Sequence, residues 1–97
     1  MSGNNNSNPS VSREVAVKNQ LGLHARPASM FVKMATRFKS DILVEKEGEE
    51  VNGKSIMGLM MLAAGPGSIL TVTAEGSDAT EAVDDLEALV NRNFEEG

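Results

Sequence analysis

Residues 19–38 read NQLGLHARPASMFVKMATRF, and the change from a turn to a helix within this stretch decides the fold. The turn holds Asn, Gln and Gly, and after it apolar residues recur at steps of three and four, which predicts an amphipathic helix over residues 25–38. Pro27 falls in the first turn of that helix, where a missing amide hydrogen removes no helical bond. His24 is therefore predicted at the N-cap. The apolar positions are Ala28, Phe31, Val32, Ala35 and Phe38.

Alternating apolar and polar residues predict four strands around this helix. Residues 11–17 form the first strand, with Val on one side and charged residues on the other. Residues 41–51 contain two short runs separated by a turn at residues 47–48, which predicts an antiparallel hairpin. Residues 70–74 form the last strand, with β-branched Thr on the polar side.

Two more helices complete the predicted order. Ser55 is a favoured N-cap for a short helix over residues 56–63. The last helix opens at Asp78 with Glu81 three residues later, an arrangement typical of a capping box. The order β-α-β-β-α-β-α, with strands that bury one face and helices to cover it, predicts an α+β two-layer sandwich in one domain over residues 11–97.

Composition excludes several classes of function. The chain has 97 residues, no cysteine, three aromatic residues and a net charge of −5. Disulfides and thiolate metal sites are excluded, and a nucleic-acid partner is not expected because phosphate backbones need a basic surface. We expect a cytoplasmic protein that does not insert into a membrane, since no apolar run approaches the roughly 20 residues of a membrane helix. Residues 1–10, rich in Ser, Asn and Gly, predict a disordered tail.

His24 is the only histidine and the candidate for chemistry. An imidazole at a helix start lies beside first-turn amides that have no intrahelical acceptor, and Arg26 follows two residues later. Those amides, the helix dipole and a guanidinium would stabilise a phosphoryl group on the ring without a metal or a cofactor. A small carrier can share such a site with its partner, because phosphoryl transfer depends chiefly on positioning and charge.

Two motifs resemble the HPr family, the histidine phosphocarriers of the bacterial phosphoenolpyruvate-dependent phosphotransferase system. They are residues 22–28, GLHARPA, and residues 52–60, NGKSIMGLM. The resemblance implies an open-faced β-sandwich, in which a four-stranded antiparallel sheet carries three helices on one face. It also implies that enzyme I phosphorylates His24 at Nδ1, that Arg26 assists, and that the group passes to an enzyme IIA domain. The protein would be a covalent intermediate in phosphoryl transfer rather than a stand-alone enzyme.

The resemblance adds a regulatory site and a docking surface. Ser55 has a structural interpretation as a helix cap. The resemblance to the family implies in addition that HPr kinase/phosphorylase phosphorylates this serine. Several methionines are predicted to form an exposed patch beside His24, because other residues already supply the core faces of both helices. The residues assigned to partner binding are Ala25, Pro27, Lys54, Ile56, Met57 and Met60.

Two functions from different classes stay open. One is a carrier in sugar uptake, and the other is a regulatory phosphoprotein or binding module of the nitrogen branch, controlled at His24 and at Ser55. The Ser55 segment resembles sugar-branch relatives, whereas residues 59–62 and 89–94 resemble the nitrogen-branch paralogue. Leu21 departs from many sugar-branch relatives, which carry a small polar residue there. We expect a monomer in either case.

Overall fold

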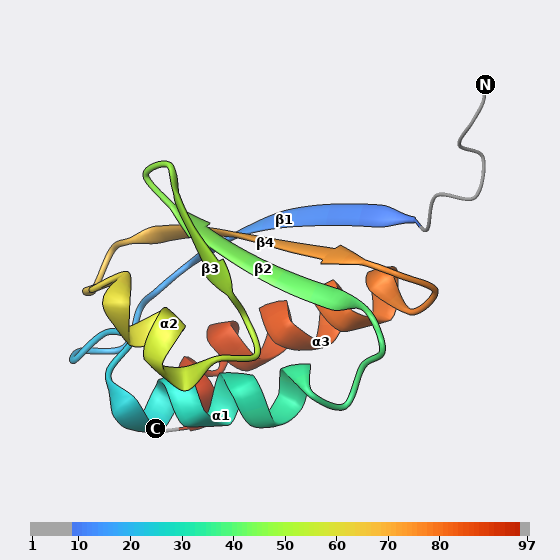
Figure 1. Ribbon diagram of the computed structural model, residues 1–97. Coiled ribbons are helices and arrows are strands. Elements are labelled where there is room, and N and C mark those ends of the chain that lie inside the picture. Colours follow the sequence, from blue (N-terminus) through green and yellow to red (C-terminus); the bar gives the residue numbers. More distant parts are fainter. Residues whose placement is uncertain (1–8, 96–97) are drawn as a thin grey trace.

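A four-stranded antiparallel sheet carries its helices on one face (Figure 1). The structure is a computed structural model and describes residues 9–95. The elements follow the predicted order, and the predicted α+β fold, a four-stranded antiparallel sheet with three helices, is confirmed. Their bounds are β1 Ser10–Ala16, α1 Ala25–Ala35, β2 Asp41–Lys46, β3 Glu49–Asn52, α2 Ile56–Met61, β4 Ile69–Glu75 and α3 Ala79–Asn91, followed by a short 3-10 turn over Asn93–Glu95.

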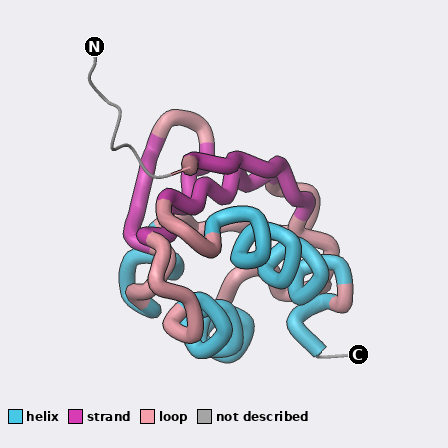
Figure 2. The backbone as a smooth tube through the Cα atoms, turned by 90° about the vertical axis from the view of Figure 1, so that its right-hand side faces the viewer, coloured by secondary structure: helices cyan, strands magenta, loops and turns pink. Residues whose placement is uncertain are grey.

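The strands lie in the order β1-β4-β2-β3, so that β4 returns to the middle of the sheet between β1 and β2. In Figure 2 the strands form one layer and the helices a second layer beneath it. Val44 of β2 pairs with Val72 of β4, and both side chains point into the space between the layers. The layers meet there in one core, as the alternation of the strands predicted.

The core is filled by the apolar stripes that the sequence places on the helices. Phe31 of α1 is 1% exposed, and Ala28 and Ala35 on the same face are fully buried. Val32 and Phe38 are only partly buried and pack at the margin of this core. From α3 the buried side chains are Ala79, Ala82, Val83, Leu86, Leu89 and Val90.

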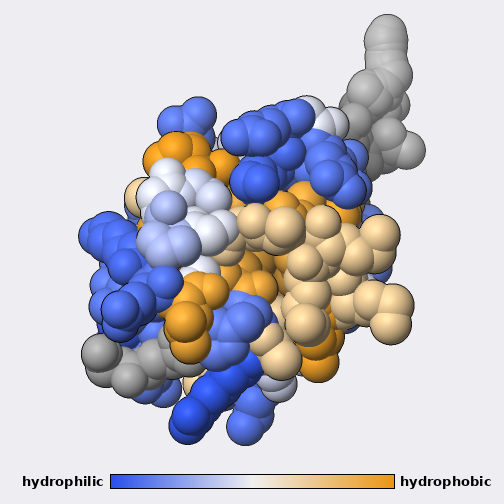
Figure 3. All heavy atoms as spheres, turned by 90° about the vertical axis from the view of Figure 1, so that its left-hand side faces the viewer, coloured by the Kyte–Doolittle hydropathy of each residue, from blue (hydrophilic) through white to orange (hydrophobic). Residues whose placement is uncertain are grey.

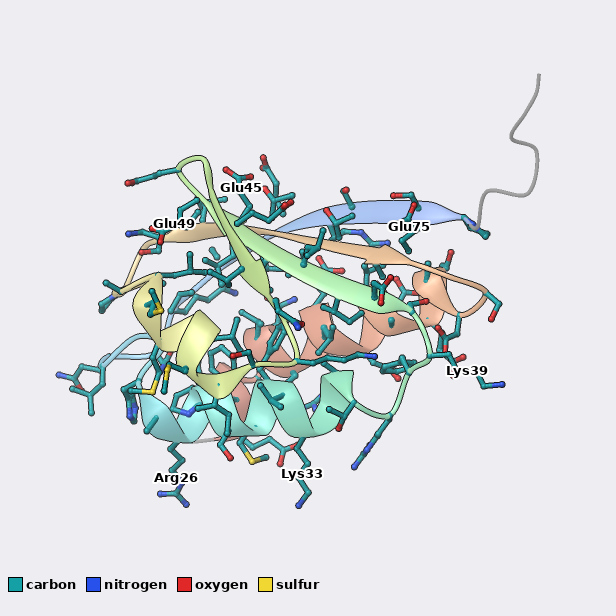
Figure 4. The ribbon with its side chains drawn as sticks, in the orientation of Figure 1. Arg26, Lys33, Lys39, Glu45, Glu49 and Glu75 are labelled. Carbon is teal, nitrogen blue, oxygen red and sulfur yellow. The ribbon has the colours of Figure 1, made fainter. Side chains whose placement is uncertain are left out.

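The other face of the sheet is uncovered and acidic. Glu14 of β1, Thr71 of β4, Glu45 of β2 and Glu50 of β3 are aligned in register across all four strands. Val15, Val44 and Val72, which are next to three of these residues, point into the core, so the row faces the other side of the sheet. Figure 4 shows Glu45 on the side of the sheet away from the helices.

Several predicted boundaries differ from the structure by one to three residues. Helix α1 ends at Ala35 rather than Phe38, because the Thr36 hydroxyl donates to the Lys33 carbonyl at 3.0 Å and the chain then turns toward β2. Strand β1 begins at Ser10, within the predicted tail, because Ser10 is paired with Glu75. The rest of that predicted tail, residues 1–8, lies outside the described residues.

The predicted capping box at α3 is wrong, although Asp78 does occupy the N-cap position. Its carboxylate makes no cap bond to its own helix. It accepts hydrogen bonds from the amides of Lys39 and Ser40, at 2.8 and 3.0 Å, and from the Ser40 hydroxyl at 2.5 Å. Ser40 is 1% exposed, so its hydroxyl needs a partner inside the protein. Asp78 therefore fastens the start of α3 to the connection between α1 and β2.

These bonds make the stability depend on pH. The hydrogen bond from the Ser40 hydroxyl, followed by that from the Lys39 amide, lowers the pKa of Asp78 below its usual range. A lowered folded-state pKa contributes stability that is present above the unfolded pKa and is lost as the pH falls through the folded value. We expect Asp78→Asn to be less stable than wild type at pH 7, and the difference to shrink below about pH 4.

Urea denaturation of both proteins at pH 7 and at low pH measures this difference in the free energy of unfolding. Asp85→Asn changes an exposed carboxylate on the same helix and is the matched control. A difference between wild type and Asp78→Asn that stays constant with pH would contradict the assignment.

Candidate functional site

His24 is the N-cap residue of α1, as predicted, and its side chain is half-buried. Its backbone is extended, and its carbonyl accepts the amide of Ala28 at 3.0 Å. The imidazole itself makes no cap bond to the helix. Because Pro27 has no amide hydrogen, the first-turn donors at this end are the amides of Ala25 and Arg26. The imidazole therefore lies at a positive helix end whose donors it does not occupy.

One nitrogen of the ring is turned inward. Nε2 of His24 is shut off from solvent. The ring lines a shallow hollow of about 280 Å³, whose other walls are Leu21, Leu23, Met60, Ala63, Ala64 and Gly65. In this orientation of the ring, Nε2 is closed to a second molecule.

The turn before His24 is held against the chain that follows α2. Leu23 donates its amide to the Ala64 carbonyl at 2.8 Å. Gly22 has a positive φ of 70°, and a Cβ at this position would lie 2.4 Å from the Ala64 carbonyl oxygen. Only glycine fits both conditions, so Gly22 fixes how closely the His24 turn approaches the end of α2.

Helix α2 presents an apolar surface beside this hollow. Its exposed side chains are Ile56, Met57, Met60 and Met61, which line a second hollow of about 450 Å³ and are called the α2 patch here. Figure 3 shows an apolar area on the face at this end of the molecule. Met60 lines both hollows, so the patch is continuous with the His24 site. The predicted exposed methionine patch therefore exists on α2, whereas Met30 and Met34 on α1 are partly buried against the core.

Ser55 caps α2, as predicted. Its Oγ accepts the amide of Gly58 at 3.0 Å, and the residue is half-buried. The hydroxyl thus lies at the edge of the α2 patch, next to exposed Ile56 and Met57.

The other predicted site residues are arranged less simply. Ala25 and Arg26 are exposed, and Figure 4 shows Arg26 pointing outward from α1, away from the sheet and from α2. Pro27, which is predicted to contact a partner, is buried in the first turn of α1. The Lys54 ammonium donates to the Phe38 carbonyl at 2.9 Å, so this lysine ties α2 to the end of α1.

Asn19 is buried in the turn before His24, which the sequence does not predict. It is 6% exposed, and its side-chain amide donates to the Gly22 carbonyl at 2.7 Å. A buried asparagine cannot be distinguished by sequence from an exposed turn asparagine, since both favour turns. Within residues 9–95, no group of three or more His, Cys, Asp or Glu could hold a metal ion. No helix in that range is long and apolar enough to cross a membrane.

Comparison with known proteins decides the family. The family model described as "PTS HPr component phosphorylation site" matches residues 11–92. The chain belongs to the HPr family. HPr proteins are phosphocarriers of the phosphotransferase system, and the resemblance of the two motifs is thereby confirmed.

The relatives include both HPr and HPr-like proteins. The HPr-like protein Crh of Halalkalibacterium halodurans is 51% identical over 82 residues, which cover 84% of this chain and 98% of that protein. The phosphocarrier protein HPr of Neisseria meningitidis serogroup A is 45% identical over 87 residues, which cover 90% of this chain and 98% of its own. The structure of HPr-C-His from Thermoanaerobacter tengcongensis has a TM-score of 0.86 at 44% identity, with coverage of 90% and 98%. An HPr dimer from the same organism has a TM-score of 0.70 at 46% identity, with coverage of 82% and 92%.

The close approach at Gly22 can be tested by adding one methyl group. We expect Gly22→Ala to lower the free energy of unfolding by about 2 kcal/mol or more, because the left-handed backbone and the clash with Ala64 both oppose it. Urea denaturation at pH 7 measures the change.

Two glycines in nearby turns separate these causes. Gly67 has a positive φ of 89° but open space around its Cβ position, so Gly67→Ala reports backbone strain alone, about 1 kcal/mol. Gly65 has open space and no such φ, so Gly65→Ala should change little. Equal losses for Gly22→Ala and Gly67→Ala would show that the approach to Ala64 is not tight.

Proposed function

We propose that this protein accepts a phosphoryl group on Nδ1 of His24 from phosphorylated enzyme I and donates it to enzyme IIA domains in sugar uptake. The observation that carries the proposal is the half-buried imidazole at the N-cap of α1, which leaves the amides of Ala25 and Arg26 uncapped. The enclosure of Nε2 supports Nδ1 as the atom that reacts.

The transfer needs one bond to form and one to break. The Nδ1 lone pair attacks phosphorus, the bond from phosphorus to the donor breaks, and the donor atom keeps that electron pair. The phosphoryl oxygens then lie near the amides of Ala25 and Arg26, where backbone donors and the helix dipole stabilise their charge. Passing the group to an acceptor is the same step in reverse with a different partner, so the site must hold the group without trapping it.

Arg26 is suited to a role that depends on the partner. Its side chain is exposed and points into solvent from the first turn of α1. A guanidinium in this place can turn toward phosphoryl oxygens when a partner closes over the site, because it is long and its N–H groups form a fork. We assign Arg26 an assisting role in transfer on this basis.

The α2 patch is the proposed docking surface for both partners. Ile56, Met57 and Met60 are exposed beside the His24 hollow, and flexible thioethers can adapt to more than one partner. Ala25 borders the site on the α1 side, and Lys54 contributes by holding α2 to α1. A monomer suits this function, because a dimer that covered the α2 patch would exclude the partners.

The assignment of His24 predicts the outcome of a labelling assay. In the presence of enzyme I and labelled phosphoenolpyruvate, wild type should acquire an acid-labile phosphoryl group and His24→Ala should acquire none, because no other described residue offers this nucleophile. His24→Ala should keep its fold, since the imidazole makes no cap bond to α1. Circular dichroism and a urea titration provide the control.

Arg26→Ala is the graded comparison in the same assay. It should still accept phosphate, at a rate lower by about ten-fold, since removing one charged donor weakens transfer without abolishing it. Acid-labile label on His24→Ala would overturn the proposal. Transfer from labelled wild type to sugar-type or to nitrogen-type enzyme IIA domains then separates the sugar branch from the nitrogen branch.

A second candidate function is regulatory, through phosphorylation of Ser55. It is favoured by the position of the Ser55 hydroxyl at the N-terminus of α2 and at the edge of the α2 patch. A phosphate there adds nearly two negative charges where the helix end accepts them and where a docking partner must approach. The similarity to an HPr-like protein Crh as well as to HPr supports considering this function beside the first.

Ser55 phosphorylation has its own test. HPr kinase and ATP should place one phosphate on Ser55, and mass spectrometry locates it. Ser55→Ala should remain unmodified. The control Ser29→Ala, which changes an exposed serine on α1, should be modified normally. Phosphorylated protein should accept phosphate from enzyme I about ten-fold more slowly or worse, which corresponds to roughly 1.4 kcal/mol of barrier. An unmodified Ser55 peptide would remove this function.

A further inference from the structure

All the sulfur in this protein belongs to methionine side chains. The chain has six methionines and no cysteine, so an oxidant meets thioethers and no thiol. Five of the six lie within the described residues, in two groups. Met30 and Met34 are on α1, and Met57, Met60 and Met61 are on α2. The surroundings of these two helices therefore decide which sulfur atoms an oxidant reaches.

The two groups of methionines differ in exposure. On α2, Met57 is 73% exposed, Met61 is 66% exposed and Met60 is 43% exposed. On α1, Met30 and Met34 are partly buried and pack against the core. A side chain is oxidised more readily when the oxidant can reach its sulfur. Met57 and Met61 are therefore the most accessible to an oxidant among the described methionines.

Met57 and Met61 lie in the middle of the α2 patch. They are four residues apart on one helix, which places their side chains next to each other. Together with Ile56 and Met60 they line the hollow of about 450 Å³, so every side chain of its lining is apolar. An oxygen atom added to either sulfur would therefore enter the surface on which phosphotransfer partners are proposed to dock.

Oxidation of a thioether changes this surface from apolar to polar. A sulfur lone pair attacks one oxygen of hydrogen peroxide, the O–O bond breaks, and the second oxygen leaves as water after taking up the proton of the first. The sulfur is oxidised to a sulfoxide and the peroxide is reduced. The sulfoxide oxygen binds water, and a partner that covers it without offering a donor leaves it unpaired, which opposes docking.

We propose that Met57 and Met61 are sites of reversible sulfoxidation by peroxides, and that the two sulfoxides weaken the docking of phosphotransfer partners on the α2 patch. This inference rests on the proposed phosphoryl transfer. The imidazole of His24 is not modified, so the phosphoryl step is retained and the encounter with the partner is weakened. A thiol-dependent methionine sulfoxide reductase restores each thioether, while two thiols are oxidised to a disulfide and the oxygen leaves as water.

Peptide mapping by mass spectrometry shows where oxygen enters. Over a series of hydrogen peroxide concentrations, Met57 and Met61 should each gain one oxygen before Met30 and Met34 gain any. The circular dichroism spectrum should stay unchanged at this stage, because the modified side chains lie outside the core. Oxidation of Met30 or Met34 as early as Met57 would overturn the assignment of the sites.

Phosphoryl acceptance from enzyme I measures the effect on docking. Catalase first removes the peroxide, so that enzyme I itself is not oxidised. The enzyme I concentration at half-maximal rate should then rise about ten-fold, the effect of an acceptor left unpaired in an interface, while the maximal rate is retained. Methionine sulfoxide reductases for both sulfoxide epimers should restore the original value. An unchanged half-maximal concentration, or a rise that the reductases do not reverse, would contradict the inference.

Two double variants locate the sensitivity to peroxide. Met57→Leu with Met61→Leu keeps apolar side chains of similar volume and removes both thioethers. Each variant is compared with itself before and after the same dose of peroxide, so any effect of the substitutions on docking cancels. The half-maximal concentration of the α2 variant should not respond to peroxide. That of Met30→Leu with Met34→Leu, the matched control on α1, should rise as in wild type.

The reverse result would place the sensitivity on α1 and overturn the inference. Failure of untreated wild type to accept any phosphate would instead overturn the proposed function. The order in which the methionines are oxidised does not depend on phosphoryl transfer, so it tests the modification sites in either case.

Discussion

The contact between the turn at Gly22 and the chain after α2 is the constraint on which the site depends. The two segments are some forty residues apart in sequence, and the bond from the Leu23 amide to the Ala64 carbonyl joins them. Because Gly22 has no side chain, its backbone approaches Ala64 closely enough for Met60 and His24 to border one hollow. Without this approach the imidazole and the α2 patch would be two unrelated surface features.

The elements themselves were predictable because their signals are local. Apolar residues alternate along β2 and β4 and recur at steps of three and four along α1. Both patterns mark the faces that are removed from water, and the structure buries those faces. The N-cap positions of His24 and Ser55 were predicted for the same reason, since an N-cap is set by the residues next to it.

The features that the sequence did not predict depend on tertiary contacts. Asp78 has the sequence context of a capping box. Its carboxylate instead accepts a hydrogen bond from the buried hydroxyl of Ser40, 38 residues earlier in the chain. Lys54 is predicted to bind a partner, and the sequence gives no sign that its ammonium also donates to the Phe38 carbonyl. None of these partners lies within the window that a local pattern covers, and the burial of Asn19 escaped prediction for the same reason.

The row of glutamates on the uncovered face of the sheet has a consequence for how the protein behaves among its copies. A bare sheet face is flat and would stack on another such face if it were apolar. Glu14, Glu45 and Glu50 repel their counterparts in any such stack. Within the row, Thr71 separates Glu14 from Glu45, whereas Glu45 and Glu50 are opposite each other and depend on solvent to screen their charges. One face of the sheet can therefore stay uncovered without becoming an apolar stacking surface, while most of the exposed large apolar side chains, apart from Leu43 and Ile69, lie on α2 and at Leu21.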